Sequence, residues 1–201
     1  MSSLLDSNSR FAYNPTRINN IERARFNLSF DHKTSFNVGQ LIPFDVIEVL
    51  PGDTFDLETN MLVRLQTLLA PVMDDLYLDV YWFFVPNRLV WEHWKEFMGE
   101  NTKSAWYPST QYEVPQINFE GSPGSTANGS VFDYMGIPPT VLGSGGSVNA
   151  LPWRAYQLIW NEWFRDQNLQ DPLLINTSDT AESVTEENLL NYMPLMANKY
   201  H

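Results

Sequence analysis

The 201-residue sequence contains no cysteine and only three histidines. The absence of cysteine excludes a disulfide framework and a thiolate metal site. His32, His93 and His201 lie far apart and never in the H-x-x-x-H spacing of a helical metal site, so we expect no histidine-based metal centre. His93 lies between two tryptophans and is expected to be a structural histidine, either exposed or hydrogen-bonded.

Long apolar runs and nucleotide-binding or nucleophile motifs are also missing. No segment approaches the roughly 18 apolar residues that cross a bilayer, and MSSLLDSNSRFAYNPTR lacks the basic and apolar regions of a signal peptide. The glycine-rich GSGGS lacks the lysine of a P-loop, and neither G-x-G-x-x-G after a strand nor G-x-S-x-G occurs. We therefore predict no membrane segment, no cofactor and no catalytic residue. Carboxylates at i, i+4 spacing could still form acid/base pairs, but solvated helix faces are the expected role of Glu92, Glu96, Glu162 and Asp166.

Charge is sparse and unevenly distributed. Charged residues make up 18% of the chain and the net charge is −12, which argues against nucleic-acid binding by the chain as a whole. Residues 1–33 nevertheless carry five basic and three acidic groups, a net charge of +2, against −14 for the remainder. Two interpretations stay open: an ordinary polar tail, or an arm that faces phosphates or acidic neighbouring subunits.

Aromatic residues are abundant, at 14%, and the apolar content is 43%, which predicts a folded protein with buried surface, some of it between subunits. Alternating apolar residues predict β-strands at 41–50, 54–69 and 76–85, with weaker candidates at 35–40 and 111–119. Both faces of 76–85 carry bulky side chains, so both should be covered.

Two helical segments carry tryptophan. Pro86 should end the preceding strand, Asn87 should cap a short helix, and Gly99 should stop it. Residues 131–139 could form one helical turn. The segment LPWRAYQLIWNEWFRDQNLQDP, residues 151–172, predicts the clearest helix, with proline in its first turn. Its aromatic stripe could be a sugar- or base-stacking platform. Packing on a sheet or on a neighbouring subunit is the expected role of Trp153, Tyr156, Trp160 and Trp163.

Three stretches resemble the major capsid proteins of the Microviridae, nearest to the gokushovirus-like branch. They are LPGDTFDL (50–57), APVMDDLYLDVYWFFVPNRLVWEHWKEFMGE (70–100) and LPWRAYQLIWNEWFRDQNLQDPLLI (151–175). The resemblance implies a mainly-β viral jelly roll with helical and loop insertions, and no catalytic residue. It implies a homo-oligomeric T=1 icosahedral shell around a circular single-stranded DNA phage genome, assembled in the bacterial cytoplasm. It also implies an interior N-terminal arm and a separate small basic DNA-binding virion protein.

Members of that family are much longer than this chain, and a jelly roll needs about eight strands. We therefore expect the N-terminal part of a capsid protein, with an incomplete jelly roll. Residues 1–33 are predicted to form an extended arm, and 34–201 part of one jelly-roll domain with insertions at 100–175. The candidate interface residues are Trp91, Trp94, Trp153, Trp160 and Trp163. The candidate DNA-facing arm residues are Arg10, Arg17, Arg23 and Arg25. A β-sandwich carbohydrate- or receptor-binding module, or a glycoside-acting enzyme, remains an alternative.

Overall fold

The computed structural model describes residues 23–104, 106–107, 110–119, 129–138 and 146–184. The chain divides into two compact units, Met1–Lys33 and Thr34–His201. Within the first unit, the described residues form neither helix nor strand, and the Asn27 side chain accepts a hydrogen bond from the Ser29 amide at 3.0 Å. Arg23 and Arg25 are exposed there, while Arg10 and Arg17 lie outside the described residues. The extended arm therefore stays a prediction.

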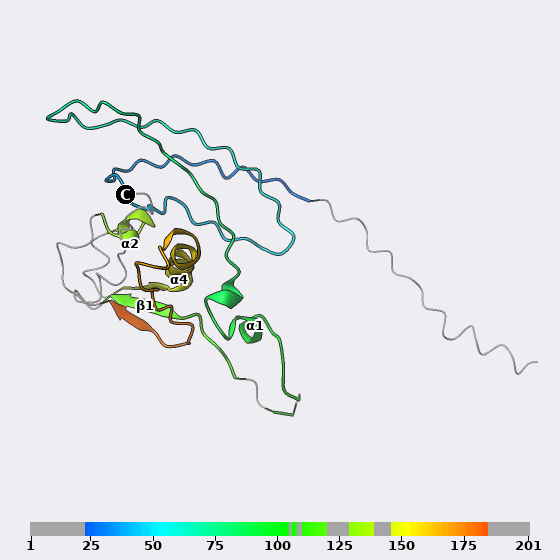
Figure 1. Cartoon of the computed structure of the whole chain (residues 1–201). Helices are drawn as coiled ribbons and strands as arrows, with labels where there is room; N and C mark the ends of the chain where they lie inside the picture. Colours follow the sequence, from blue (N-terminus) through cyan, green and yellow to red (C-terminus); the bar gives the residue numbers. More distant parts are fainter. Residues whose placement is uncertain (1–22, 105, 108–109, 120–128, 139–145, 185–201) are drawn as a thin grey trace, which may run out of the picture. The chain divides into compact units, whose positions relative to one another are not determined.

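The second unit contains a small mixed sheet (Figure 1). Strand β1, Gln116–Phe119, lies in the centre. It pairs antiparallel with β2, Ser147–Asn149, and parallel with β3, Glu182–Val184. The weak strand expected at 111–119 is thus confirmed for its last four residues. Pro115 precedes β1 and cannot donate to a ladder, but its carbonyl accepts a hydrogen bond from the Ala150 amide at 2.9 Å.

Helix α2, Val131–Tyr134, confirms the helical turn expected near residue 131. The Ser130 side chain accepts a hydrogen bond from the Asp133 amide at 3.3 Å, while the Asp133 carboxylate accepts one from the Gly129 amide at 2.9 Å. This reciprocal arrangement satisfies two backbone donors at the start of the helix. The helix ends before Gly136, whose φ of 89° is readily adopted only by glycine. Helix α2 thereby places Val131 and Phe132 in the core.

Helix α4, Leu151–Ile159, begins where the sequence predicts, with Pro152 in its first turn. It continues as the π-helical turn η3, Trp160–Phe164, and ends there, so the prediction of one helix to residue 172 is wrong. The reason lies in side chains that bind the following loop instead. The Asn161 side chain exchanges two hydrogen bonds with the Leu173 backbone, both at 2.9 Å. The Asp166 carboxylate accepts a hydrogen bond from the Asn168 amide at 2.9 Å, which forms a turn.

The main core lies between β1, α2 and α4. The T-shaped Phe119–Phe132 pair and the tilted Phe132–Trp153 pair have ring centroids 5.2 and 5.3 Å apart. Two tyrosines attach the start of the second unit to this core: Tyr134 donates to the Ser35 carbonyl at 3.0 Å and Tyr156 to the Leu41 carbonyl at 2.9 Å. Burial raises the pKa of both phenols, so both remain protonated donors at neutral pH.

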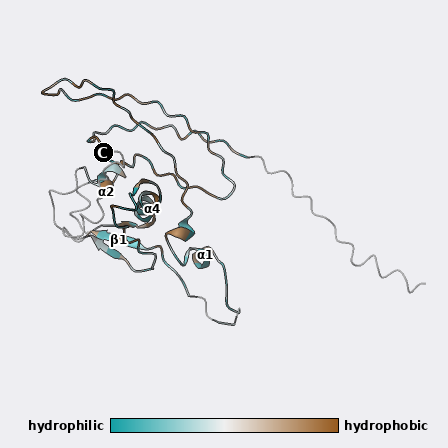
Figure 2. Ribbon diagram, in the orientation of Figure 1, coloured by the Kyte–Doolittle hydropathy of each residue, from teal (hydrophilic) through white to brown (hydrophobic). Residues whose placement is uncertain are grey.

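The strands predicted at 41–50, 54–69 and 76–85 are not formed as paired strands. These segments are long traces without helix or ladder, along which hydrophobic and hydrophilic residues are mixed (Figures 1 and 2). Large apolar side chains stay exposed, with Leu62 at 90% and Met73 at 92%. The alternation is compatible with a strand, but a ladder also needs a neighbouring strand, and the described residues offer none to these segments.

Candidate assembly site

A cluster of aromatic side chains lies at the corner formed by residues 83–98, here called the aromatic corner. Its interior is a small core of Val90, Trp91 and Leu151, with Val85 and Trp94 packed against it. Trp91 is fully buried and contacts the rings of Trp94 and Phe97 at centroid distances of 6.1 and 5.2 Å. The corner is thus anchored to α4 within the same chain.

The corner is not the single helix that the sequence predicts. It consists of a 3-10 turn, η2, Asn87–Leu89, and the short helix α1, Trp94–Phe97. Asn87 does not cap with its side chain: η2 has no side-chain cap, and the Asn87 carbonyl accepts from the Val90 and Trp91 amides. The helix is interrupted because the Glu92 amide donates to the Thr177 carbonyl at 3.1 Å, outside any helical pattern. Gly99 does terminate α1, with a φ of 101°.

Asp179 fastens the loop that precedes β3 to the aromatic corner. Its carboxylate accepts a hydrogen bond from the Trp91 indole at 2.6 Å and lies 2.9 Å from Nδ1 of His93. His93 also stacks on Tyr112, with ring centroids 4.4 Å apart. His93 is therefore a hydrogen-bonded structural histidine, as predicted. We call Asp179, Trp91 and His93 the clasp.

The clasp has a defined protonation preference. The hydrogen bond to Asp179 raises the pKa of His93 above its ordinary 6.5, and the charges of Asp179, Glu92 and Glu96 act in the same direction. Burial alone would raise the pKa of Asp179, but the hydrogen bonds from Trp91 and His93 outweigh it, so this pKa lies below its ordinary value. The clasp is strongest when His93 is protonated and Asp179 is ionised.

A buried ion pair connects α4 to the same loop and to the corner. Arg154 is 1% exposed, and its Nε and Nη2 donate to Oε1 of Glu182 at 3.1 and 2.8 Å. Its Nη1 donates to the carbonyls of Val90 and Ser178 at 3.3 and 3.1 Å. One guanidinium therefore links α4, β3, the corner and the loop between them. Sequence reasoning missed this pair; an arginine beside Trp153 within the aromatic stripe was its only local signal.

The five candidate interface tryptophans occupy different environments. Trp91, Trp153 and Trp160 are buried within their own chain. Trp94 is half-buried, and Trp163 is 68% exposed. Of these five tryptophans, Trp163 and part of Trp94 are therefore accessible for a contact with another subunit. The stacking-platform alternative loses its basis, because Trp153, Tyr156 and Trp160 turn their rings into the core.

Trp163 stands beside an apolar groove of about 160 Å³ between residues 83–89 and the end of α4. Its ring lies 5.7 Å from that of Phe83, which also makes an edge contact with Phe164 at 6.0 Å. The π-helical turn of η3 gives Trp163 this position, because its wider turn rotates the residue off the buried stripe of α4. The groove and its exposed tryptophan form an apolar patch of the kind that marks protein-protein contacts.

No helix among the described residues has the length and apolar character to cross a membrane. Within the same residues, no three His, Cys, Asp or Glu side chains gather into a possible metal site. The polar clusters that are present, the clasp and the Arg154–Glu182 pair, join chain segments to each other. Together with the exposed apolar segments, they give the described part of the chain a fold held by intrachain polar contacts and a surface suited to contact with other protein surfaces.

The family described as "Capsid protein (F protein)" matches residues 16–201, so the chain belongs to that family. It is 44% identical over 180 residues to capsid protein VP1 of Chlamydia phage 1, covering 87% of this chain and 29% of the relative. It is 42% identical to capsid protein VP1 of Bdellovibrio phage phiMH2K, covering 84% and 30%, and 38% identical to that of Spiroplasma virus 4, covering 91% and 33%. The resemblance to Microviridae capsid proteins is confirmed, and the chain spans about a third of the length of these relatives.

Proposed function

We propose that this chain forms part of the protein shell of a bacteriophage particle and assembles with identical copies into a T=1 icosahedral capsid. Family membership and the capsid names of the relatives support the proposal. The observation that carries it is the series of large apolar side chains left exposed across residues 57–84. They include Leu57, Met61, Leu62, Leu69, Met73, Tyr77 and Phe84. So much exposed apolar surface is typical of a protein that is covered by other chain segments after assembly.

The fold that best accounts for these segments is a jelly roll completed by further strands. Residues 54–69 alternate as a half-buried strand does, and 76–85 carries bulky side chains on both faces. Neither these segments nor 41–50 has a ladder partner among the described residues. We propose that the longer capsid polypeptide supplies these partners. Residues 34–201 are then one part of the jelly-roll domain. Its insertion at 100–175 contains β1, β2, α2 and α4, whereas β3, the third strand of the small sheet, follows the insertion.

The contact between subunits is proposed to centre on Trp163 and the groove beside it. Trp163 offers a large, exposed, rigid ring next to Phe83 and Phe164, and such rings dominate the energetics of protein interfaces. Acidic subunits repel each other, so assembly should be favoured by added salt.

We further propose that the particle encloses circular single-stranded DNA and that the arm faces the interior. The +2 charge of residues 1–33 supports this, with Arg10, Arg17, Arg23 and Arg25 as candidate phosphate contacts. Because the remainder of the chain is acidic, a small basic virion protein would supply much of the neutralising charge. Deleting residues 1–25 should lower the DNA content of particles; particles with unchanged DNA content would contradict a role for the arm.

Negative-stain microscopy of the purified capsid polypeptide that contains this chain tests the main proposal. Uniform closed shells are expected, and a monodisperse monomer under all salt conditions would refute it. Glycan arrays on the same sample test the binding-module alternative, for which the buried stripe of α4 offers no platform.

A further inference from the structure

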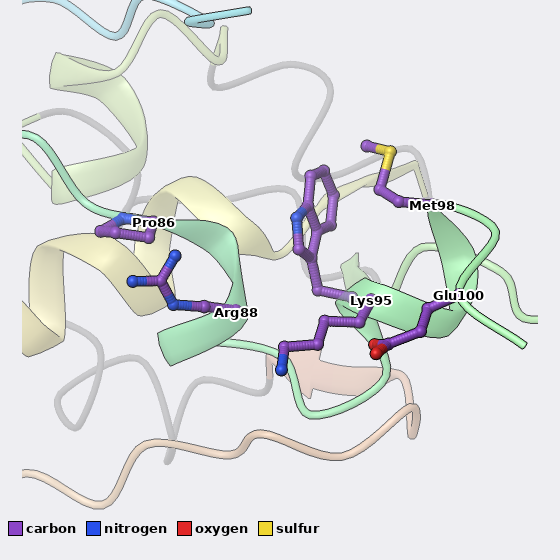
Figure 3. Close-up of a pocket in the computed structure, with 6 residues that line it drawn as sticks. Pro86, Arg88, Lys95, Met98 and Glu100 are labelled. Carbon is purple, nitrogen blue, oxygen red and sulfur yellow. The ribbon is translucent and has the colours of Figure 1, made fainter. Parts of the chain in front are cut away.

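A pocket of about 370 Å³ opens on the aromatic corner between η2 and α1 (Figure 3). It is a shallow depression that is largely open to solvent. Figure 3 shows the side chains of Arg88 on η2 and Lys95 on α1, with Glu100 near Lys95. The pocket is lined by Pro86, Arg88, Trp94, Lys95, Met98 and Glu100.

Arg88 and Lys95 bring two of the few exposed basic side chains beyond residue 33 to this pocket. The exposed basic residues that the structure describes in that part of the chain are Arg64, Arg88, Lys95 and Lys103. Two of the four line this one pocket. Within the described residues, neither Arg88 nor Lys95 places its side chain in an ion pair or hydrogen bond. With Glu100 as the only acid, the lining has one positive charge in excess, although the chain is −12.

Trp94 gives the pocket an aromatic wall that is held in place. Its ring lies 6.1 Å from Trp91 and 5.9 Å from Phe97, and Trp91 is itself fixed by Asp179. The indole is only half-buried by these neighbours. A positioned aromatic ring and two cations that have no partner among the described residues line the same pocket. This combination suits single-stranded nucleic acid, in which bases stack and phosphates pair with basic groups.

We propose that this pocket binds one nucleotide of single-stranded DNA, with the base against the indole of Trp94 and the adjoining phosphates at Arg88 and Lys95. The proposal rests on the proposed packaging of DNA and gives it a site outside the N-terminal arm. An acidic peptide would satisfy the two cations equally well, but it would make no use of the aromatic wall. Stacking on Trp94 therefore favours the nucleotide.

The affinity test follows the fluorescence anisotropy of a labelled ten-nucleotide oligothymidylate as the 201-residue chain is added, at several salt concentrations. Trp94→Leu should weaken binding about tenfold through lost stacking, and Trp94→Phe should restore most of it. Arg88→Gln and Lys95→Gln should each reduce the slope of log affinity against log salt by about 0.7. Glu100→Gln should tighten binding because it removes the opposing charge. Lys103→Gln, an exposed lysine outside the pocket, is the matched control and should change little.

A cross-linking test uses the unaltered chain and so does not depend on variants that fold. An oligonucleotide carrying 5-iododeoxyuridine is irradiated with the protein, and the attached peptides are identified by mass spectrometry. Attachment at Trp94 is expected. Attachment only outside residues 86–100 would overturn the proposal. Equal competition by oligoglutamate, together with unchanged oligothymidylate binding by Trp94→Leu, would assign the pocket to an acidic peptide and also overturn it.

The outcomes separate this proposal from the proposed function. Closed shells with no nucleotide contact at Trp94 would refute the pocket and leave the capsid function intact. Nucleotide binding at Trp94 by a polypeptide that never forms shells would support the pocket and refute the capsid function.

Discussion

Arg154→Leu tests whether one buried guanidinium holds α4, β3 and the aromatic corner together. Leucine keeps the apolar stem but removes four hydrogen bonds: two to Glu182 and one each to the Val90 and Ser178 carbonyls. The Glu182 side chain is only 11% exposed, so its charge would remain buried without the guanidinium. Removing one partner of a buried ion pair costs about 3–5 kcal/mol. We expect a fall of that size in the free energy of unfolding.

Urea denaturation followed by tryptophan fluorescence measures this loss. Glu182→Gln keeps an acceptor oxygen but not the charge, and should cost about 1–3 kcal/mol. Arg64→Leu, an exposed arginine elsewhere in the same unit, should change stability by about 0.5 kcal/mol at most.

The double variant Arg154→Leu/Glu182→Leu separates two contributions to the loss of stability: the buried charge of Glu182 and the lost packing of Arg154. Because it removes the Glu182 carboxylate together with the guanidinium, it should be more stable than Arg154→Leu alone. An Arg154→Leu variant within about 0.5 kcal/mol of the parent would refute the reasoning.

Three further predictions concern assembly, pH and helix capping. Trp163→Ser should leave the free energy of unfolding nearly unchanged but weaken each subunit contact by roughly 1–3 kcal/mol, seen by sedimentation velocity; normal assembly would contradict the interface. Because folding raises the pKa of His93, the protonated ring stabilises the fold fully below pH 6.5, its ordinary pKa. This stabilisation is lost as the pH rises through the raised pKa of the folded state. The lowered pKa of Asp179 contributes stability above its ordinary 3.8 that is lost on acidification. The clasp should therefore be strongest between pH 3.8 and 6.5. In urea titrations, His93→Asn should abolish the loss of stability that the parent shows as the pH rises; a variant with the parent's pH profile would contradict this role of His93. Ser130→Ala should cost about 0.5–2 kcal/mol in the same titrations by removing the cap of α2, and no loss would argue against the cap.

Features with a local cause were predictable from the sequence. Pro152 marks the first turn of α4, and Gly99 marks the end of α1, because each residue type has a backbone preference that operates within a few residues. The aromatic content of α4 correctly indicated burial, whereas α1 contains no buried residue. It did not indicate which rings face inward, since the π-helical turn at the end of α4 separates Trp160 from Trp163.

Features that depend on distant partners were not predictable. Trp91 and Asp179 are 88 residues apart, and Arg154 and Glu182 are 28 apart, so no periodicity or spacing connects them. The helix expected from Asn87 onward fails for the same reason, because the Glu92 amide is taken by Thr177. The predicted strands at 41–85 also depend on distant partners. Their alternation describes one face of a sheet, but neighbouring strands decide whether a sheet forms.

The aromatic corner shows why tryptophans that are close in sequence need not share a role. Trp91 is buried and held by Asp179, so it supports the fold of its own chain. Trp94, three residues later, rests on Trp91 and leaves part of its ring uncovered at the pocket that Arg88 and Lys95 also line. The rigidity of Trp91 fixes the ring of Trp94, so less conformational entropy would be lost when a ligand stacks on it. Mutation of Asp179 should accordingly weaken nucleotide binding at a pocket that it does not line, through the looser position of Trp91.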